Sequence, residues 1–174
     1  MAQRQPHPLV QLAKETVESY VRTGNIREPT NLAPEMEKRA GVFVSIKKQG
    51  YLRGCIGTFE PTRPNIAEEI IANSISAATR DPRFPPVSAA ELHDLDYSVD
   101  VLTEPEPVKD KADLDPKRYG IIVECRGRRG LLLPDLEGVD TVEQQIDICR
   151  RKASILPNES IRLHRFEIKR YRYS

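Results

Sequence analysis

Hydrophobic and polar positions along the chain first indicate three helices. Between Leu9 and Val21, apolar residues recur at steps of three and four, which predicts an amphipathic helix that ends near Gly24. A second helix is predicted over residues 64–80, "PNIAEEIIANSISAATR", with Pro64 in its first turn. The spacing of Thr141 and Gln144 is that of a capping box, so a third helix is expected to begin there. Ser88 and Glu91 have the same spacing, which predicts one short helical turn.

Strand-like segments lie between and beyond these helices. The residues 41–48 and 50–59 are predicted to form one hairpin, and the residues on either side of the turn "RGRRG" (126–130) a second. Residues 95–104 are expected to form a further strand, and residues 161–173 a closing strand with a bulge, because its apolar parity switches. Several hairpins without a βαβ rhythm predict an α+β fold with a mainly antiparallel sheet flanked by helices.

The register of the first hairpin follows from sorting its side chains. A two-residue loop would place Arg53 opposite Ile46 and mix a charge into the apolar face. A three-residue loop over residues 48–50, with Gly50 in a left-handed conformation, places Ile46 opposite Leu52 and leaves one face apolar. Since a slip of one residue moves every side chain to the other face, we predict the three-residue loop.

Composition narrows the classes of protein that the chain can belong to. With 174 residues it is expected to be one domain, and Lys+Arg 27 against Asp+Glu 26 gives a formal net charge of +1. That balance argues against a general polyanion binder. The start of the chain (1–6) has no apolar signal region, and no apolar run approaches the length of a membrane span. Three widely separated cysteines favour a reducing compartment, so we expect a cytoplasmic protein.

The six-residue motif "LRGCIG" at residues 52–57 carries a resemblance to a known family. With it, "DPRFPP" (81–86), the following residues 91–108, and "ICRRKASI" (148–155) make the chain resemble the AMMECR domain family over nearly its whole length. One departure is Ser154, which stands where glycine is usual in the family.

The resemblance implies a fold and a setting rather than a reaction. It implies a single AMMECR-type domain over residues 1–174, with a larger and a smaller α/β subdomain and the motif near a groove between them. The activity of the family is unsettled, and we expect no cofactor. In prokaryotes such domains occur together with a MEMO-type protein and a radical S-adenosylmethionine protein. We therefore expect a ligand- or partner-binding component of an intracellular modification pathway shared with those two proteins.

Within the motif, Arg53 and Cys55 are the residues that can carry chemistry. Residues i and i+2 of a strand share a face, and a guanidinium near a thiol favours the thiolate. Gly54 and Gly57 leave room for a ligand or another backbone. Cys55 is thus a candidate catalytic residue, and Arg53, Gly54 and Gly57 are candidate binding residues for a small anionic ligand. In the structural alternative, Cys55 packs as a small hydrophobe and Gly54 seats a helix.

Asp81 and Arg83 follow the second predicted helix and could bring a carboxylate and a second guanidinium to the same groove. We include both as candidate ligand-binding residues, although Arg83 could simply pair with Asp81. A buried Arg53 needs either a carboxylate partner such as Asp81 or a ligand, because an unpaired buried charge is costly. Of the two, we favour Arg53 pointing into the groove.

Two other classes of function stay open at this point, and whether the chain is an enzyme is undecided. A Cys55-dependent enzyme needs a base, and none of the three histidines, His7, His93 and His164, has a local spacing to Cys55. No Cys-x-x-Cys or His-x-x-x-His spacing is present, so no metal site is predicted.

A regulator that binds nucleic acid is the third class. Basic residues gather in "RGRRG" and in the C-terminal tail, where aromatic residues interleave with them, a pattern typical of single-stranded nucleic acid sites. It is equally typical of a solvated strand face, and with a net charge of +1 we do not expect nucleic acid as a partner. The tail residues concerned are Arg162, His164, Arg165, Phe166, Lys169, Arg170, Tyr171, Arg172 and Tyr173.

Overall fold

The computed structural model describes residues 5–172 and divides into two compact units. Of the described residues, unit 1 takes in residues 5–101 and 169–172, and unit 2 takes in residues 102–168. Residues 1–4, at the start of the chain, and Tyr173 of the basic tail lie outside the described residues. Among the helices that the structure describes, none has the length and apolar character needed to cross a membrane.

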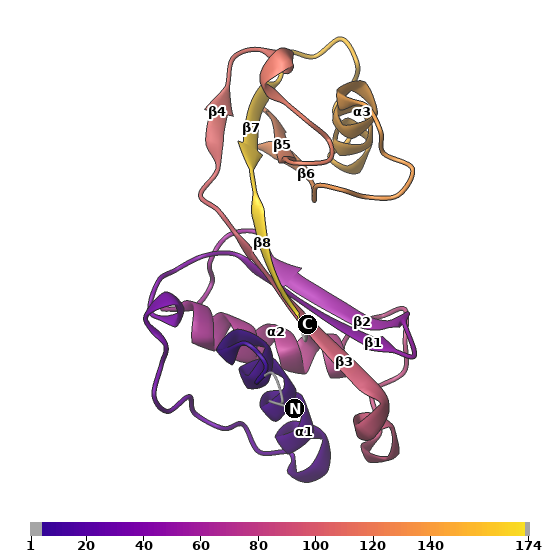
Figure 1. Cartoon of the computed structure of the whole chain (residues 1–174). Coiled ribbons are helices and arrows are strands. Elements are labelled where there is room, and N and C mark those ends of the chain that lie inside the picture. Colours follow the sequence, from indigo (N-terminus) through magenta and orange to yellow (C-terminus); the bar gives the residue numbers. More distant parts are fainter. Residues whose placement is uncertain (1–4, 173–174) are drawn as a thin grey trace. The chain divides into compact units, whose positions relative to one another are not determined.

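Unit 1 is a four-stranded antiparallel sheet in the order β2-β1-β3-β8, with α1 and α2 against one face (Figure 1). Both helices are amphipathic as predicted, and the left-handed Gly24 ends α1. Its elements are α1 (Pro8–Thr23), η1 (Pro34–Met36), β1 (Val42–Lys48), β2 (Tyr51–Thr58), α2 (Ile66–Thr79), η2 (Ala89–Asp94), β3 (Leu95–Leu102) and β8 (Ile168–Arg172).

The core of unit 1 lies between the sheet and the two helices. Val42, Val44 and Ile46 of β1 point toward the helices and are fully buried. The start of α2 differs from the prediction in one detail. Asn65 is its N-cap and accepts a hydrogen bond from the Glu68 backbone N–H, so Pro64 precedes the helix and is not in its first turn.

The first hairpin has the predicted partners but a different register. Its turn has two residues, 49–50, and Gly50 has a φ of 82°, left-handed as predicted. A β-bulge then follows, so that Ile46 pairs with Gly54 and not with Leu52.

The bulge explains why the predicted register was wrong. Arg53 is the extra residue, because its neighbours Leu52 and Gly54 pair with the consecutive residues Lys47 and Ile46. One extra residue changes the parity of the strand, which restores the separation of apolar and polar faces that the two-residue turn alone would lose. Sorting of side chains therefore holds, but a bulge achieves it and a longer loop does not.

Unit 2 is a second four-stranded antiparallel sheet, in the order β4-β7-β5-β6, and α3 packs against it around a separate core. The predicted capping box of Thr141 and Gln144 opens α3. Together the two units confirm an α+β fold with antiparallel sheets and flanking helices. The elements of unit 2 are β4 (Glu106–Val108), η3 (Lys111–Asp113), β5 (Gly120–Cys125), β6 (Arg128–Leu132), α3 (Val142–Lys152) and β7 (Arg162–Phe166).

The closing segment is two strands rather than one strand with a bulge. β7 belongs to the sheet of unit 2 and β8 to the sheet of unit 1, with Glu167 between them. Each sheet has its own buried face, so the switch in apolar parity marks the change of sheet.

Each unit places a helix directly on a glycine of its sheet. A Cβ atom at Gly54 would lie 2.1 Å from the carbonyl oxygen of Ala77 in α2. A Cβ atom at Gly130 of β6 would lie 2.0 Å from the carbonyl oxygen of Cys149 in α3. Gly54 therefore seats a helix, which is the structural alternative considered for it.

Gly54→Ala is expected to lower the free energy of unfolding by about 1–3 kcal/mol, because the new methyl group meets helix backbone that must move away. Denaturant unfolding followed by circular dichroism measures the loss. Lys47→Ala, on the exposed part of the neighbouring strand, is the control and should change stability by less than about 0.5 kcal/mol. A cost for Gly54→Ala no larger than that of the control would show that the contact is not tight.

Candidate functional site

The motif lies on β2, an edge strand of the unit 1 sheet. An edge strand presents backbone N–H and C=O groups that no neighbouring strand satisfies. Side chains from the segment after α2 form hydrogen bonds with some of these backbone groups. They also form an ion pair with the arginine of the motif.

Arg53 forms an ion pair inside unit 1, so the expectation that it is left for a ligand is wrong. Its Nε donates to Glu91 Oε1 at 2.9 Å and its Nη2 to Glu91 Oε2 at 3.2 Å, a bidentate pair. It also donates to the backbone carbonyls of Pro85 and Pro86 at 2.8 and 3.3 Å. The Arg53 side chain is only 12% exposed. These four contacts give the buried guanidinium the hydrogen-bond partners that water would otherwise supply. Its partner is Glu91 rather than Asp81.

Glu91 gathers several donors at one carboxylate. It completes the predicted capping box with Ser88 at the start of η2, and it accepts from Lys48 Nζ at 3.2 Å. The hydrogen bonds from Arg53, followed by those from the Ser88 backbone, hold the pKa of Glu91 well below its ordinary value. Glu91 is thus an anchor for the motif that the sequence analysis had identified only as a helix cap.

Asp81 and Arg83 close the edge of β2 at Cys55. Asp81 Oδ2 accepts a hydrogen bond from the Cys55 backbone N–H at 3.0 Å, and Arg83 Nη2 donates to the Cys55 carbonyl oxygen at 3.4 Å. The two side chains also pair with each other, with Arg83 Nη2 2.7 Å from Asp81 Oδ2. They engage one N–H and one C=O of the edge strand, as a neighbouring strand would.

The two partners differ in exposure, and this decides what each can offer. The Asp81 side chain is 2% exposed, and the hydrogen bond from Arg83 is the largest cause that lowers the pKa of its carboxyl far below the ordinary value. The Arg83 side chain is 56% exposed, and its pairing with Asp81 raises its pKa. Asp81 is therefore an internal anchor, whereas Arg83 presents part of a cation to solvent.

The thiol of Cys55 is the other outward-facing group of the motif. Cys55 is half-buried and accepts a hydrogen bond from the Ser45 hydroxyl, with Oγ and Sγ 3.2 Å apart. Cys125 and Cys149 are buried, and burial raises the pKa of Cys149 to about 11. Of the three cysteines, Cys55 is the one that is not buried.

An aromatic pair lies on the same side of the sheet as Cys55. Phe43 is opposite Gly57, where a Cβ atom would lie 2.2 Å from the Phe43 ring. The Phe43 ring meets the Phe59 ring edge to face at a centroid distance of 5.0 Å. Gly57 thus makes room for a ring. We call Phe43, Ser45, Cys55, Gly57 and Phe59 the motif face.

The histidines do not join this site. Within residues 5–172, no hydrogen bond or ion pair links a histidine to Cys55. His7 caps α1 and lies near Glu35, His93 is 76% exposed beside Asp94, and His164 belongs to β7 of unit 2. Nor does any group of three His, Cys, Asp or Glu residues in the described chain have the geometry to hold a metal ion.

Glu69 is a further polar anchor that the sequence analysis missed. It is 1% exposed and accepts hydrogen bonds from Thr58 Oγ1, Thr62 and the Arg63 backbone N–H, which ties down the loop between β2 and α2. Burial alone would raise its pKa, but these hydrogen bonds outweigh burial and lower it. The available signal was its helical phase, since Glu69 falls between the inward-facing Ile66 and Asn73.

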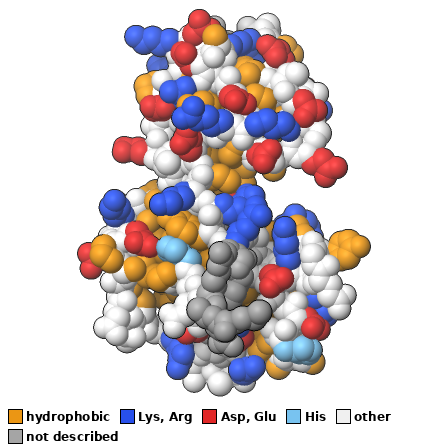
Figure 2. Space-filling model, in the orientation of Figure 1, with side chains coloured by type: hydrophobic (Ala, Val, Ile, Leu, Met, Phe, Trp, Pro, Cys, Tyr) orange, Lys and Arg blue, Asp and Glu red, His pale blue; other side chains and the backbone are white. Residues whose placement is uncertain are grey.

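Four of the nine basic residues considered for nucleic acid form ion pairs. Each of Arg128, Arg129, Arg165 and Arg170 lies within ion-pair distance of a carboxylate. On the face drawn in Figure 2, Asp and Glu side chains are interspersed with Lys and Arg side chains over unit 2. The tail is also divided between two sheets, so its basic residues do not follow one strand.

Arg53→Ala is expected to lower the free energy of unfolding at pH 7 by about 3 kcal/mol, because it leaves a largely buried Glu91 carboxylate without its bidentate partner. Glu91 contributes this stability above its ordinary pKa of 4.5 and loses it as the pH falls through its depressed folded-state pKa. The difference between wild type and variant should therefore shrink below pH 4.5. Thermal and denaturant unfolding across pH measure both effects.

The matched control for this experiment is Arg151→Ala. Arg151 is 72% exposed and pairs with Asp147 one helical turn away, so its loss should cost about 0.5 kcal/mol or less. If Arg53→Ala costs no more than the control at pH 7, the ion pair with Glu91 does not anchor the motif.

Native-state alkylation by iodoacetamide should modify Cys55 before Cys125 and Cys149. Cys55 is half-buried whereas the other two are buried. A pKa raised from 9.0 to about 11 leaves Cys149 with about 100-fold less thiolate than an ordinary cysteine. Mass spectrometry of the peptides over time measures the three rates, and unfolding in denaturant should equalise them. Equal protection of all three thiols in the native state would place Cys55 in the core.

Comparison with known proteins supports the resemblance seen in the sequence. The AMMECR1 family profile matches residues 10–174. A protein of Thermotoga maritima is 53% identical over 170 residues, which cover 95% of this chain and 98% of that protein. A protein of Methanothermobacter thermautotrophicus is 41% identical over 173 residues, covering 91% of this chain and 89% of that one.

A third relative, protein CA_C1420 of Clostridium acetobutylicum, is 49% identical over 96% of this chain but only 36% of its own length. The chain thus spans about a third of that protein. Among solved structures, the crystal structure of the uncharacterized protein PH0010 from Pyrococcus horikoshii matches with a TM-score of 0.81 at 34% identity, covering 93% of this chain and 88% of that one. From the profile match, the sequence relatives and the shared fold, the chain belongs to the AMMECR1 family.

Proposed function

We propose that the protein is a cytoplasmic binding component of a modification pathway, and that it recognises its partner through the motif face and Arg83. The observation that carries the proposal is the division of labour at the motif. Arg53 and Asp81 form contacts within unit 1, which hold β2 in place, while Cys55 is only half-buried and the Arg83 side chain is largely exposed. A rigid strand with a thiol, a cation and two aromatic rings suits recognition of a partner.

The contacts around Cys55 favour binding over catalysis. A nucleophilic thiol needs a base within hydrogen-bond reach. The side-chain group that is hydrogen-bonded to the Cys55 sulfur is the Ser45 hydroxyl, which donates to the sulfur and does not act as a base. The 56% exposed guanidinium of Arg83 leaves room for an anionic group of the partner or of a small ligand.

The proposed partners are the MEMO-type and radical S-adenosylmethionine proteins that accompany such domains in prokaryotes. The Clostridium relative supports association with further protein. This chain matches only 36% of it, so a domain like this one is covalently joined there to a larger remainder.

The proposal is tested by calorimetric titration of the purified protein with the MEMO-type and radical S-adenosylmethionine proteins encoded in the same genome. Cys55→Tyr adds bulk to the motif face and is expected to weaken binding about tenfold or more, equivalent to at least 1.4 kcal/mol. Cys125→Ala, which removes a buried thiol of unit 2, is the matched control and should bind as wild type. Unfolding curves establish that each variant is folded.

A further variant, Cys55→Ala, separates docking from thiol chemistry. Binding should persist in Cys55→Ala if the thiol only contributes surface, and a covalent adduct that depends on Cys55 would indicate an enzyme instead. If neither protein binds wild type, or if Cys55→Tyr binds both as wild type does, the motif face is not the docking surface.

A further inference from the structure

A groove on unit 1 runs along the outer side of α2, and neither the motif nor the proposed function uses it. Its walls are the end of α1, the loop over residues 26–29, the segment before α2 and α2 itself, and its volume is about 630 Å³. That volume lies within the range of small-molecule sites. We call it the α2 groove.

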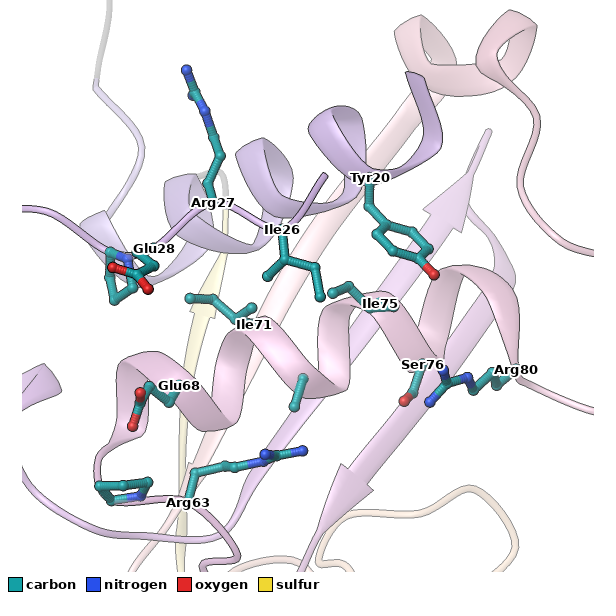
Figure 3. Close-up of a pocket in the computed structure, with 13 residues that line it drawn as sticks. Tyr20, Ile26, Arg27, Glu28, Arg63, Glu68, Ile71, Ile75, Ser76 and Arg80 are labelled. Atoms are coloured by element: carbon teal, nitrogen blue, oxygen red, sulfur yellow. The ribbon is translucent and has the colours of Figure 1, made fainter. Parts of the chain in front are cut away.

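The floor of the α2 groove is apolar. Figure 3 shows Ile26 from the loop pointing toward Ile71 and Ile75 of α2, with the ring of Tyr20 beside them. Ile71 and Ile75 are largely buried at 7% and 6% exposure, but Ile26 is 61% exposed. A ligand with an apolar body would cover Ile26 and remove that surface from water, which is favourable.

Unpaired cations line the same groove. Arg63 and Arg80 are exposed, and neither guanidinium has a hydrogen bond or ion pair with another residue in the described chain. In Figure 3 the two side chains extend from opposite ends of α2 toward the middle of the helix, and the Ser76 hydroxyl lies near Arg80. The carboxylates of Glu28 and Glu68 lie at the other end of the groove. Guanidinium groups recognise carboxylates and phosphates in preference to neutral groups.

From this arrangement we infer that the α2 groove binds a small amphipathic anion, with its acidic head between Arg63 and Arg80 and its apolar body over Ile26, Ile71 and Ile75. Charge complementarity selects the head, because an uncharged ligand would leave both guanidinium groups without a partner. The site is independent of the proposed function, since no residue of the motif face or of its anchors lines the groove.

Sodium octanoate is a suitable probe, with 1-octanol as its uncharged counterpart. In a titration followed by NMR of isoleucine methyl groups, octanoate should shift the signals of Ile26, Ile71 and Ile75 in a saturable manner with one site per chain. Octanol lacks the carboxylate and should bind about tenfold more weakly or worse, corresponding to 1.4 kcal/mol.

Variants at exposed positions test the two halves of the site without disturbing the core. The double variant Arg63→Gln/Arg80→Gln should weaken octanoate about tenfold while leaving octanol unchanged. Ile26→Asp should weaken both ligands, because it places a charge where the apolar body lies. Arg22→Gln, an exposed arginine of α1 outside the groove, is the matched control and should behave as wild type.

Three results would overturn the inference. The first is octanoate binding that the double variant retains at full strength. The second is a set of shifts that spreads over isoleucines outside the groove. The third is a concentration-dependent dimer in sedimentation that Ile26→Asp abolishes, since a second copy of the chain would then be the occupant of the groove.

Discussion

An edge strand that must be closed is the constraint on which the motif depends. In the part of the chain that the structure describes, β2 has β1 on one side and no strand on the other, so its outer backbone groups need partners from elsewhere in the chain. Asp81 and Arg83 supply them at Cys55, and Glu91 holds the bulged residue Arg53 beside it. The absence of a side chain at Gly54 lets α2 approach closely enough for the segment that follows it to reach β2. The motif therefore works as one unit with the side chains that bind its outer edge, and these residues are up to 38 positions apart in sequence.

Much of the fold could be predicted from the sequence, because local periodicity and capping determine it. Local periodicity and the spacing of capping residues predicted the helices, both hairpins and the capping boxes at Ser88 and Thr141. The bulge at Arg53 could not be predicted, since a short turn with a bulge and a longer turn sort the same side chains equally well. At Ser154, the structure explains a residue type that is usual in the family but that this sequence lacks. Its φ of 56° is left-handed, which explains why glycine is usual there in the family.

The candidate site was predictable in its residues but not in their partners. The motif identified Arg53 and Cys55, and the pairing of Asp81 with Arg83 was one of the two possibilities considered. That Glu91 holds Arg53 was not predictable, because Glu91 already had a sufficient local role as a helix cap. A carboxylate can accept several hydrogen bonds at once. A residue that caps a helix through one of these bonds can therefore still bind a second, distant partner through the others. Long-range polar pairing needs the fold before it can be assigned.

The insertion of unit 2 between β3 and β8 has a consequence for how the chain is made. β8 lies beside β3, where Arg170 forms a bidentate pair with Asp100, yet β8 follows the whole of unit 2 in the sequence. On the ribosome, every residue of unit 2 has therefore been added before unit 1 receives its final strand. The unit that starts first is completed last. A chain that ended at Ile168 would lack nearly all of β8, a strand of the unit 1 sheet, and keep the whole of unit 2.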